Sequence, residues 1–233
     1  RIAMGTAKMR WSQTGYGRTS STSVAQETPR NLFGFKDGTN NIKSEDGDAK
    51  LNEHLWVQKG DDSGADWMAG GTYFVVRKIH MFAEMWDNLR LIEQEQTFGR
   101  DKRYGAPLNV TAPTSGKDEF KPIDFKAKNK EGELEVPADS HIAIVNPEQN
   151  KGRWMLRRGY NYTEGSDALG RLSAGLFFIA FVRDPRTNFY PILDKMTQKD
   201  ALSEYLQHQA RALFAIPAGI GQSDTMVGQA LFS

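Results

Sequence analysis

GTYFVVRKIHM, residues 71–81, alternates in polarity and is rich in β-branched and aromatic side chains, which predicts a β-strand. Beyond it, apolar residues recur at spacings of three and four, which predicts an amphipathic helix that ends near Gly99. The apolar stripe of this helix consists of Phe82, Met85, Trp86, Leu89 and Ile92. A strand followed directly by such a helix indicates a domain in which sheet and helices pack in layers.

Three later segments complete the predicted architecture. GLFFIAFVRDP, 175–185, is an apolar run typical of a buried strand, and NFYPILDKM, 188–196, is expected to pair with it. TQKDALSEYLQHQARALF, 197–214, predicts the last helix, with Thr197 as its N-cap and Asp200 three residues later. Its buried side would consist of Leu202, Leu206, Ala210 and Leu213. Strands mixed with two long helices predict an α+β layer architecture.

Loop composition divides the chain into a linker and one domain. Residues 1–31 are rich in Ser, Thr, Gly and Gln in their second half and are predicted to be a linker, so that residues 32–233 form the domain. A charged, nearly aperiodic stretch at about 112–137 is predicted to be a solvated excursion over the surface. The chain opens on Arg1 without an initiator methionine, and we expect it to be a processed or truncated chain.

Composition excludes several classes of function. The 30 basic and 29 acidic side chains leave a formal charge of +1, so no overall field attracts nucleic acid or an anionic membrane. The longest apolar run, residues 175–182, is far shorter than the roughly 20 residues of a membrane-spanning helix. The absence of cysteine removes thiolate catalysis, iron–sulfur clusters and disulfides. A metal would therefore need His, Asp, Glu or Met as its ligand.

Four histidines are candidates for such a ligand. His54 lies in a polar loop and is expected to face solvent, while His80 and His208 are expected to pack or to lie on the surface. His141 follows the residues PADS and begins an apolar segment, where an imidazole can project from the edge of an element into a cavity. A structural histidine and a metal ligand both fit this position. Spacings typical of zinc sites are absent, and a single imidazole holds the iron of many haem proteins.

LFGFKDGTNN, residues 32–41, places one carboxylate, Asp37, in a glycine-rich turn. The plain interpretation is an Asp-Gly turn in which the side chain caps nearby amides. Arg157 and Arg158 lie in a segment that is otherwise largely apolar and aromatic. Because a guanidinium stays charged at any ordinary pH, at least one of them needs a buried partner or an anionic ligand. An internal salt bridge is the simpler alternative for the arginines.

Five motifs occur in the order found in dye-decolorising (DyP-type) haem peroxidases. They are RNLFGFKDGTNN (30–41), QEQTFGRDKRYGAPL (94–108), ADSHI with its following NP (138–147), MLRRGYNY (155–162) and GLFFIAF (175–181). GFKDGT matches the G-x-x-D-G-T signature of that family. The sequence resembles in particular the exported, iron-uptake-linked deferrochelatase/peroxidase branch, from about residue 1 to the C-terminus.

The resemblance implies roles for residues of this chain. His141 would be the proximal ligand of haem iron, Asp37 the distal acid–base residue and Arg157 the distal arginine. Arg158 is the alternative if the register is off by one. Further residues implied to contact haem b are Gly38, Thr39, Asn40, Asn146, Pro147, Glu148, Leu176 and Phe178, the last two on the strand face that covers the distal pocket.

The resemblance also implies a fold of two ferredoxin-like α+β halves, each an antiparallel sheet with helices, as in the dimeric α+β barrel superfamily. Haem is held mainly by the C-terminal half, which this chain resembles, and the N-terminal half is expected to be a missing partner. Two positions depart from the family pattern, because Ala143 and Glu148 stand where arginines are usual. A haem propionate would then need a cation from elsewhere, and Glu148 would repel it.

The implied activity is reduction of hydrogen peroxide with oxidation of bulky organic or dye donors through an oxoferryl intermediate. An aspartate can move a proton between the peroxide oxygens in acid, where a histidine base would already be charged. Arg157 would stabilise the charge on the departing oxygen. Electrons would travel through aromatic side chains, for which the candidates are Trp56, Trp67, Trp86, Trp154 and Tyr160.

The resemblance further implies export to the periplasm or cell exterior, a homo-oligomer and iron-uptake partner proteins. Two other functions stay open at this stage. A haem-binding deferrochelatase, which recovers iron from haem with little peroxidase turnover, would carry the same ligand set. A non-haem α+β interaction module would have no haem site. A cavity of porphyrin size beside His141 is required by the haem-based functions and not by the module.

Overall fold

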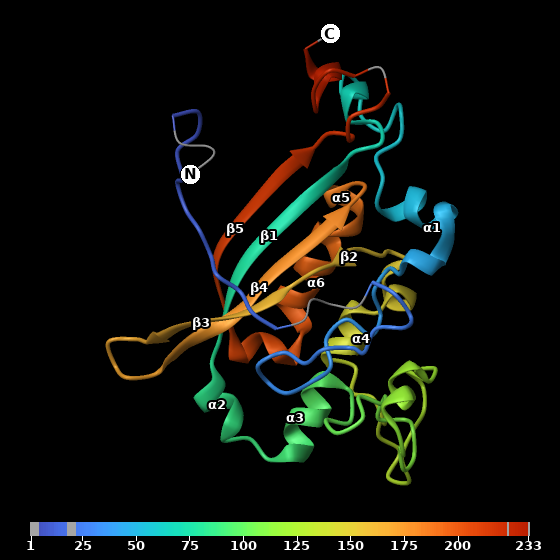
Figure 1. Ribbon diagram of the computed structural model, residues 1–233. Helices are drawn as coiled ribbons and strands as arrows, with labels where there is room; N and C mark the ends of the chain where they lie inside the picture. The colour runs from blue at the N-terminus through green and yellow to red at the C-terminus, as the bar shows by residue number, and fades with distance from the viewer. Residues whose placement is uncertain (1–4, 18–21, 223, 233) are drawn as a thin grey trace.

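The computed structural model describes residues 5–17, 22–222 and 224–232. In these residues an antiparallel sheet forms the centre of the molecule, with strand order β2-β4-β1-β5 and with β3 also paired to β4 (Figure 1). The strands are β1 Thr72–Met81, β2 Leu156–Arg157, β3 Tyr160–Ser166, β4 Leu172–Val182 and β5 Leu206–Ile216. The predicted strands at 71–81 and 175–185 are confirmed as β1 and β4, and the predicted α+β class is confirmed.

Most of the helices are short, and α5 and α6 lie against one face of the sheet (Figure 1). Phe189, between these two helices, packs there on Val75, Ala180 and Val182. None of the helices in the described ranges is long and apolar enough to cross a membrane. The helices are η1 Ser44–Asp46, α1 Gly47–His54, η2 Asp66–Met68, α2 Ala83–Asp87, α3 Leu91–Phe98, η3 Gly116–Phe120, α4 His141–Val145, η4 Pro147–Asn150, α5 Pro185–Asn188, α6 Tyr190–Lys199, η5 Ala201–Tyr205 and η6 Gln229–Leu231.

The pairing of β1 with β4 decides which side chains face the helices. Successive residues of a strand point to opposite faces, and residues directly opposite in an antiparallel pair share a face. Arg77 is paired with Phe178, and Ile79 with Leu176. These four side chains therefore stand side by side on the face that the helices cover.

An aromatic cluster beside the sheet anchors the first half of the LFGFKDGTNN segment. Phe33 stacks on Trp86 with ring centroids 4.4 Å apart, and Phe35 stacks on Phe98 at 4.0 Å. All four rings are buried. Asn31 Oδ1 accepts the backbone N–H groups of Phe33 (3.1 Å) and Phe35 (3.2 Å), which shapes the turn between the two rings. The loop that follows therefore starts from a fixed point in the core.

The predicted continuous helix over 82–99 is wrong, because the segment forms two helices, α2 and α3. Arg90 has an extended backbone with ψ of 150°, and its N–H donates to Glu93 Oε2 at 2.9 Å, which starts the second helix. Trp86 is buried, as the stripe predicts. Two other members of the stripe are exposed, namely Met85 and Ile92.

The expected pairing of NFYPILDKM with β4 is also wrong, because most of this stretch forms α6. Pro191 lies in the first turn of α6, where a missing N–H costs nothing. Thr197, the expected N-cap of the next helix, lies inside α6, and its Oγ1 donates to the Leu193 carbonyl at 2.9 Å. The helical spacing of Leu193 and Met196 therefore belongs to α6.

The predicted last helix over 197–214 is wrong beyond Lys199. Residues 201–205 form η5, and the rest forms β5, which pairs with β1 along its whole length. Leu202 in η5 is buried, as predicted, but Leu206, Ala210 and Leu213 do not continue a buried stripe, since β5 is exposed along most of its length. Backbone pairing with β1 outweighs the local helical pattern.

The stretch at 112–137 is irregular and largely exposed, as predicted, but it also contributes to the core. Glu119 in η3 is 3% exposed, and Val136 is 1% exposed.

His54 is buried as well (7% exposed), which contradicts its expected position in solvent. Its carbonyl accepts the Arg183 N–H at 2.7 Å, and burial lowers the pKa of its imidazole.

Residues 5–17 and 22–31, the described parts of the predicted linker, contain no helix or strand. Tyr16 forms an isolated bridge with Asn161, and the ring of Trp11 lies 5.7 Å from that of Phe177, on the sheet face turned away from the helices. The linker role stays a prediction. Arg1 lies outside the described residues.

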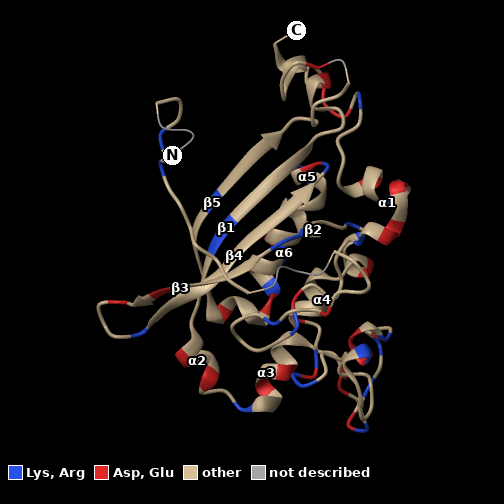
Figure 2. Cartoon of the chain, viewed as in Figure 1, with Lys and Arg blue, Asp and Glu red and all other residues tan. Residues whose placement is uncertain are grey.

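The sheet face turned away from the helices is apolar and partly uncovered. Phe74, Phe181 and Phe214 come from three adjacent strands, with ring centroids 5.0 and 5.9 Å apart. Phe214 is 50% exposed. Figure 2 shows few charged residues along these strands. Exposed aromatic patches of this kind mark interaction surfaces.

Arg77 connects β1 to β5 on the opposite face. Its Nη2 lies 2.8 Å from His208 Nδ1, and this is the one hydrogen bond of the guanidinium within the described residues. Arg77 is 6% exposed. Partial burial of the ring and, to a lesser extent, the charge of Arg77 lower the pKa of His208 to about 4.

We predict that Trp86→Ala lowers the free energy of unfolding by about 3–5 kcal/mol, because it leaves a cavity among stacked rings. Trp86→Phe should cost less, since Trp86 Nε1 has no hydrogen-bond partner among the described residues and only part of the ring is lost. Urea denaturation measures both values, with the half-exposed Trp56→Ala as control. Equal losses for Trp86→Ala and Trp56→Ala would contradict the central role of this cluster.

We further predict that unfolding becomes easier as the pH falls from about 6.5 to 4. The folded-state pKa of His208, about 4, lies below its usual value of 6.5, so the unfolded chain binds more protons in this window. The free energy of unfolding should therefore decrease with falling pH, and His208→Gln should decrease less steeply. Denaturant titrations at several pH values check this, and identical slopes would contradict it.

Candidate functional site

A deep cleft lies between the helix-side face of the sheet and helices α4 and α6. Its empty volume, which includes the open mouth, is about 1380 Å³. Its two walls are largely apolar, so it suits a large ligand with two apolar faces. The sheet contributes Ile79, Met81, Leu176 and Phe178, and the helices contribute Ile142, Val145, Ile192, Leu193 and Met196.

His141 is the first residue of α4 and lines this cleft. The start of α4 lies very close to the end of α3, which stops at Gly99 in the left-handed conformation (φ +79°). A Cβ at Gly99 would lie 2.6 Å from Ile142 Cγ1 and 2.7 Å from Ser140 Oγ. Glycine at this position therefore allows the approach that places His141 at the cleft.

A carboxylate holds the ring of His141 from behind. His141 Nδ1 lies 2.7 Å from Asp200 Oδ2, and the Asp200 side chain is 1% exposed. Asp200 Oδ1 accepts the Leu202 N–H at 3.0 Å, so both oxygens of the carboxylate are engaged. With Nδ1 committed to Asp200, Nε2 is the nitrogen available to a ligand in the cleft. The sequence pattern indicated Asp200 only as part of the start of a helix, and it did not predict this contact with His141.

Asp37 lies in the same cleft, in a turn that needs glycine at the next position, where Gly38 has φ of +109°. The Asp37 N–H donates to the Pro29 carbonyl at 2.8 Å. Arg157 Nη1 donates to Asp37 Oδ1 at 2.9 Å, and both side chains are about one-quarter exposed (25% and 24%). Asp37 Oδ2 has no hydrogen bond from the described residues, so the pair presents one free carboxylate oxygen.

Arg157, and not Arg158, is the arginine that lines the cleft. The backbone of Arg157 is held by Asn41, whose Oδ1 accepts the Arg157 N–H at 2.8 Å and whose Nδ2 donates to the Arg157 carbonyl at 3.1 Å. Arg158 instead donates its N–H to the Ile179 carbonyl at 2.9 Å. Consecutive residues of an extended segment point to opposite sides, which separates the two arginines.

Most of the other residues singled out in the sequence also line the cleft, and two do not. Glu148 is exposed outside the lining, with its N–H bonded to Asn146 Oδ1 at 2.9 Å. Ala143 is buried in a separate small cluster. The residues brought together are Gly38, Thr39, Asn40, Asn146, Pro147, Leu176 and Phe178.

Three arginines that the sequence patterns did not single out line the cleft, namely Arg77, Arg100 and Arg153. Arg77 and Arg100 are 6% and 7% exposed, and burial lowers the pKa of each guanidinium to about 10, which leaves both charged at neutral pH. Arg100 Nη1 donates to the carbonyls of Gly105 (2.6 Å) and Glu119 (2.9 Å). None of the three arginines forms an ion pair with a carboxylate of the described residues. Buried cations in this state favour a ligand with acidic groups.

The donor set of the cleft fits haem. Haem has an iron that accepts one imidazole, a large apolar ring and carboxylate side chains. The cleft offers one available imidazole nitrogen, two apolar walls and buried guanidinium groups. By contrast, no group of three or more His, Asp and Glu side chains in the described ranges is arranged to hold a bare metal ion.

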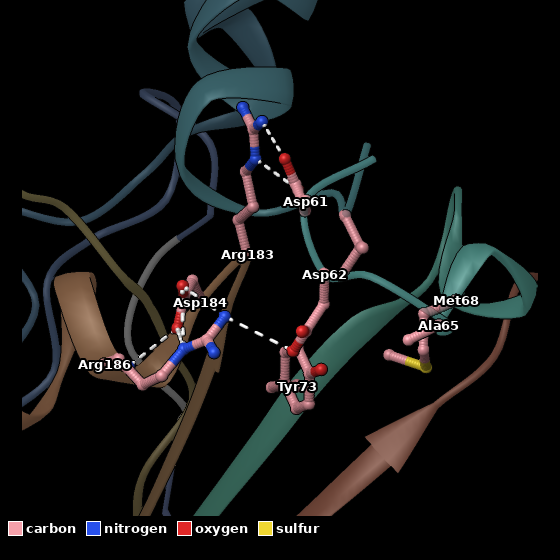
Figure 3. A pocket seen from close by; sticks show the side chains of 9 residues that line it. Asp61, Asp62, Ala65, Met68, Tyr73, Arg183, Asp184 and Arg186 are labelled. Atoms are coloured by element: carbon pink, nitrogen blue, oxygen red, sulfur yellow. Dashed lines mark hydrogen bonds and ion pairs between the residues drawn. The ribbon is translucent and has the colours of Figure 1, made fainter. Parts of the chain in front are cut away.

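A second, smaller pocket of about 240 Å³ lies near the end of β4 (Figure 3). Its charged side chains form ion pairs with one another. Arg183 binds both carboxylate oxygens of Asp61, and Arg186 pairs with Asp184 at 3.0 Å and with Asp62 at 3.4 Å. Among the described residues, this pocket therefore presents no unpaired arginine to a ligand.

The five aromatic candidates for electron transfer occupy different positions. Trp154 lines the cleft, and Lys50 Nζ lies 3.6 Å from the centroid of its ring. Trp86 belongs to the buried cluster at 1% exposure, and Trp56 is 38% exposed. Trp67 and Tyr160 are half-buried and do not line the cleft.

Comparison with known proteins agrees with the geometry of the cleft. The family model described as "Dyp-type peroxidase, C-terminal" matches residues 28–221. The dye-decolorizing peroxidase of Thermobifida fusca is 37% identical over 212 residues, which are 90% of this chain and 47% of that protein. The deferrochelatase of Yersinia pseudotuberculosis is 35% identical over 226 residues, which are 96% of this chain and 50% of that protein.

A solved structure shares the fold at similar identity. Ferric DtpA from Streptomyces lividans superimposes with a TM-score of 0.86 at 38% identity, over 98% of this chain and 59% of that chain. This chain spans about half the length of the curated relatives that it matches. The family model covers most of the chain, including Asp37, His141 and Arg157. This chain therefore belongs to the family of C-terminal domains of DyP-type peroxidases, which are haem-binding proteins.

Proposed function

We propose that this chain is the haem-binding part of a peroxidase that reduces hydrogen peroxide and oxidises bulky organic or dye donors. One observation carries the proposal: a single cleft contains an imidazole with a free nitrogen, a carboxylate paired with an arginine, and buried arginines without carboxylate partners. The relatives named as dye-decolorizing peroxidases support it.

His141 Nε2 would hold the haem iron as the proximal ligand. A histidine that donates its Nδ1–H to a carboxylate is a stronger ligand through Nε2, and Asp200 supplies that carboxylate. Arg77, Arg100 and Arg153 would pair with the acidic side chains of haem. Since Ala143 and Glu148 make no contact with the cleft, these three arginines replace the cations expected at those two positions.

Bound haem would supply the iron that reacts with peroxide, and it would store the oxidising equivalents that peroxide provides until organic donors consume them. Asp37 Oδ2, the oxygen that Arg157 leaves free, would accept a proton from one peroxide oxygen and return it to the other. Arg157 would hold Asp37 in place and stabilise negative charge on the departing oxygen. Leu176 and Phe178 would exclude bulky donors from the cleft. The electrons of such donors would therefore reach the haem through an aromatic side chain. Trp154 is the candidate that contacts the cleft.

A second candidate function is recovery of iron from haem, as in a deferrochelatase. The relatives that carry this name and are 35% identical over 96% of this chain favour it. Iron release would use the same haem site with little peroxidase turnover. The two functions differ in their products, since release of iron leaves a porphyrin without metal and peroxidase turnover leaves an oxidised donor.

The proposal includes an N-terminal half of similar fold as the partner of this chain. The uncovered aromatic face formed by Phe74, Phe181 and Phe214 supports it, because a second sheet can cover such a face. Export to the periplasm or cell exterior, a homo-oligomer and contact with iron-uptake proteins belong to the same proposal.

We predict that His141→Ala abolishes the Soret absorption of bound haem, because His141 is the one histidine that lines the cleft among the described residues. Asp200→Asn should retain the band but weaken haem binding by about 10–100-fold. Absorption titration with haem measures both effects. His80→Ala is the matched control. Because His80 lies on the other face of β1, this variant should bind haem normally. An unchanged Soret band in His141→Ala would refute the assigned ligand.

We predict that Asp37→Asn slows the reaction with peroxide by on the order of 10²–10⁴-fold and leaves the Soret band in place, because an amide cannot accept the proton. Stopped-flow absorption of the haem-loaded protein measures the rate. Asp194→Asn, on the exposed side of α6, is the control. Wild-type reactivity in Asp37→Asn together with accumulation of metal-free porphyrin would favour iron recovery instead.

A further inference from the structure

The buried side chain of Glu119 joins the surface stretch at 112–137 to the GFKDGT loop. Glu119 Oε1 accepts a hydrogen bond from Lys36 Nζ at 2.7 Å, and Oε2 accepts one from Thr39 Oγ1 at 2.6 Å. Both oxygens of one carboxylate therefore form hydrogen bonds with residues that flank Asp37. Glu119 itself does not line the cleft.

The surroundings of this contact are closed. The Lys36 side chain is 8% exposed, and its Nζ also donates to the Gly116 carbonyl at 3.2 Å. Its stem passes so close to Gly105 that a Cβ there would lie 2.8 Å from Lys36 Cδ. The Glu119 carbonyl accepts Nη1 of the cleft-lining Arg100 at 2.9 Å. One short segment thus holds the GFKDGT loop and a wall of the cleft together.

A loop that only covers the surface does not require this arrangement. Other carboxylates of the same stretch, such as Glu131 and Glu133, are exposed. A buried ion pair adds little net stability compared with apolar residues, because both charges lose their water. A buried ion pair does fix the positions of the groups that it joins. Here it fixes the residues on either side of Asp37.

We propose that Glu119 is a positioning residue that holds Asp37 in the orientation required for proton transfer. The proposal rests on the proposed function, in which the Asp37 carboxylate moves the proton of peroxide. Glu119 acts through Lys36 and Thr39 and touches no reacting atom. Misplacement of a reacting group by about 1 Å can cost about 100-fold in rate, so loss of these two contacts is expected to be visible in the kinetics.

The first test compares Glu119→Gln with Glu133→Gln in the haem-loaded protein. Glu119→Gln is expected to slow the reaction with peroxide by about 10–100-fold, while the Soret band and the KM for the organic donor stay as in the wild type. Glu133→Gln, at an exposed position of the same stretch, should react normally. Glu119→Asp keeps the charge beside Lys36 but is too short to reach both partners, so it serves if Glu119→Gln does not fold. A wild-type rate in both Glu119 variants would overturn the proposal.

A double variant tests whether Glu119 acts through Asp37. If it does, Glu119→Gln combined with Asp37→Asn reacts no more slowly than Asp37→Asn alone. Multiplied losses would overturn the proposal, because they would mean that Glu119 contributes independently of the carboxylate that it is said to orient.

Backbone hydrogen exchange in the protein without haem provides a readout that does not depend on activity. Glu119→Gln should speed exchange of the amides of residues 36–41 by roughly tenfold or more, and leave those of β5 unchanged. Unchanged exchange in the loop would overturn the positioning role. If the wild type fails to bind haem, the proposed function fails while the exchange result still stands, so the two failures are distinguishable.

Discussion

The two hydrogen bonds between the Asn41 side chain and the backbone of Arg157 join segments that are 116 positions apart, and the rest of the site depends on this junction. On one side they close the loop that carries Asp37. On the other side they fix β2, from which the Arg157 guanidinium reaches the Asp37 carboxylate at 2.9 Å. Because Asn41 is 3% exposed, water does not compete for these bonds, and the Asp37–Arg157 pair is assembled without a ligand.

Charge explains why the cleft is a binding site and not merely a gap in the core. Burial makes the charged state of Arg77 and Arg100 costly, and no described carboxylate compensates it by an ion pair. An acidic ligand would remove that cost, so the protein should gain stability when it binds one. The apolar walls select against small inorganic anions, and in the proposed function His141 adds a preference for a ligand that carries a metal. Haem meets all three conditions together.

Local sequence patterns predicted the strands whose side chains are buried. They failed where backbone pairing with a neighbouring strand alone decides the secondary structure. The alternation of β1 and the apolar run of β4 both lie at the centre of the sheet, where helices cover one face. The stretch 206–216 is exposed along most of its length, so the sequence carries no burial pattern there, and its leucines imitate a helix. Motifs located Asp37, His141 and Arg157. They could not locate Asp200 or Glu119, because the contacts of these carboxylates span 59 and 80 or more positions.

The exposure of β5 also bears on what could cover the second face of the sheet. One of its backbone edges pairs with β1 and the other has no strand beside it in the described residues, while Phe214 and Ile216 remain 50% and 39% exposed. A strand with a free edge and an apolar face is prone to unwanted association unless another element covers it. The face that lines the cleft needs no such cover, because α5 and α6 already pack on it. A partner on the aromatic face would therefore complete the burial of the sheet without touching the cleft, so the proposed haem site and the proposed partner surface lie on opposite faces of the sheet.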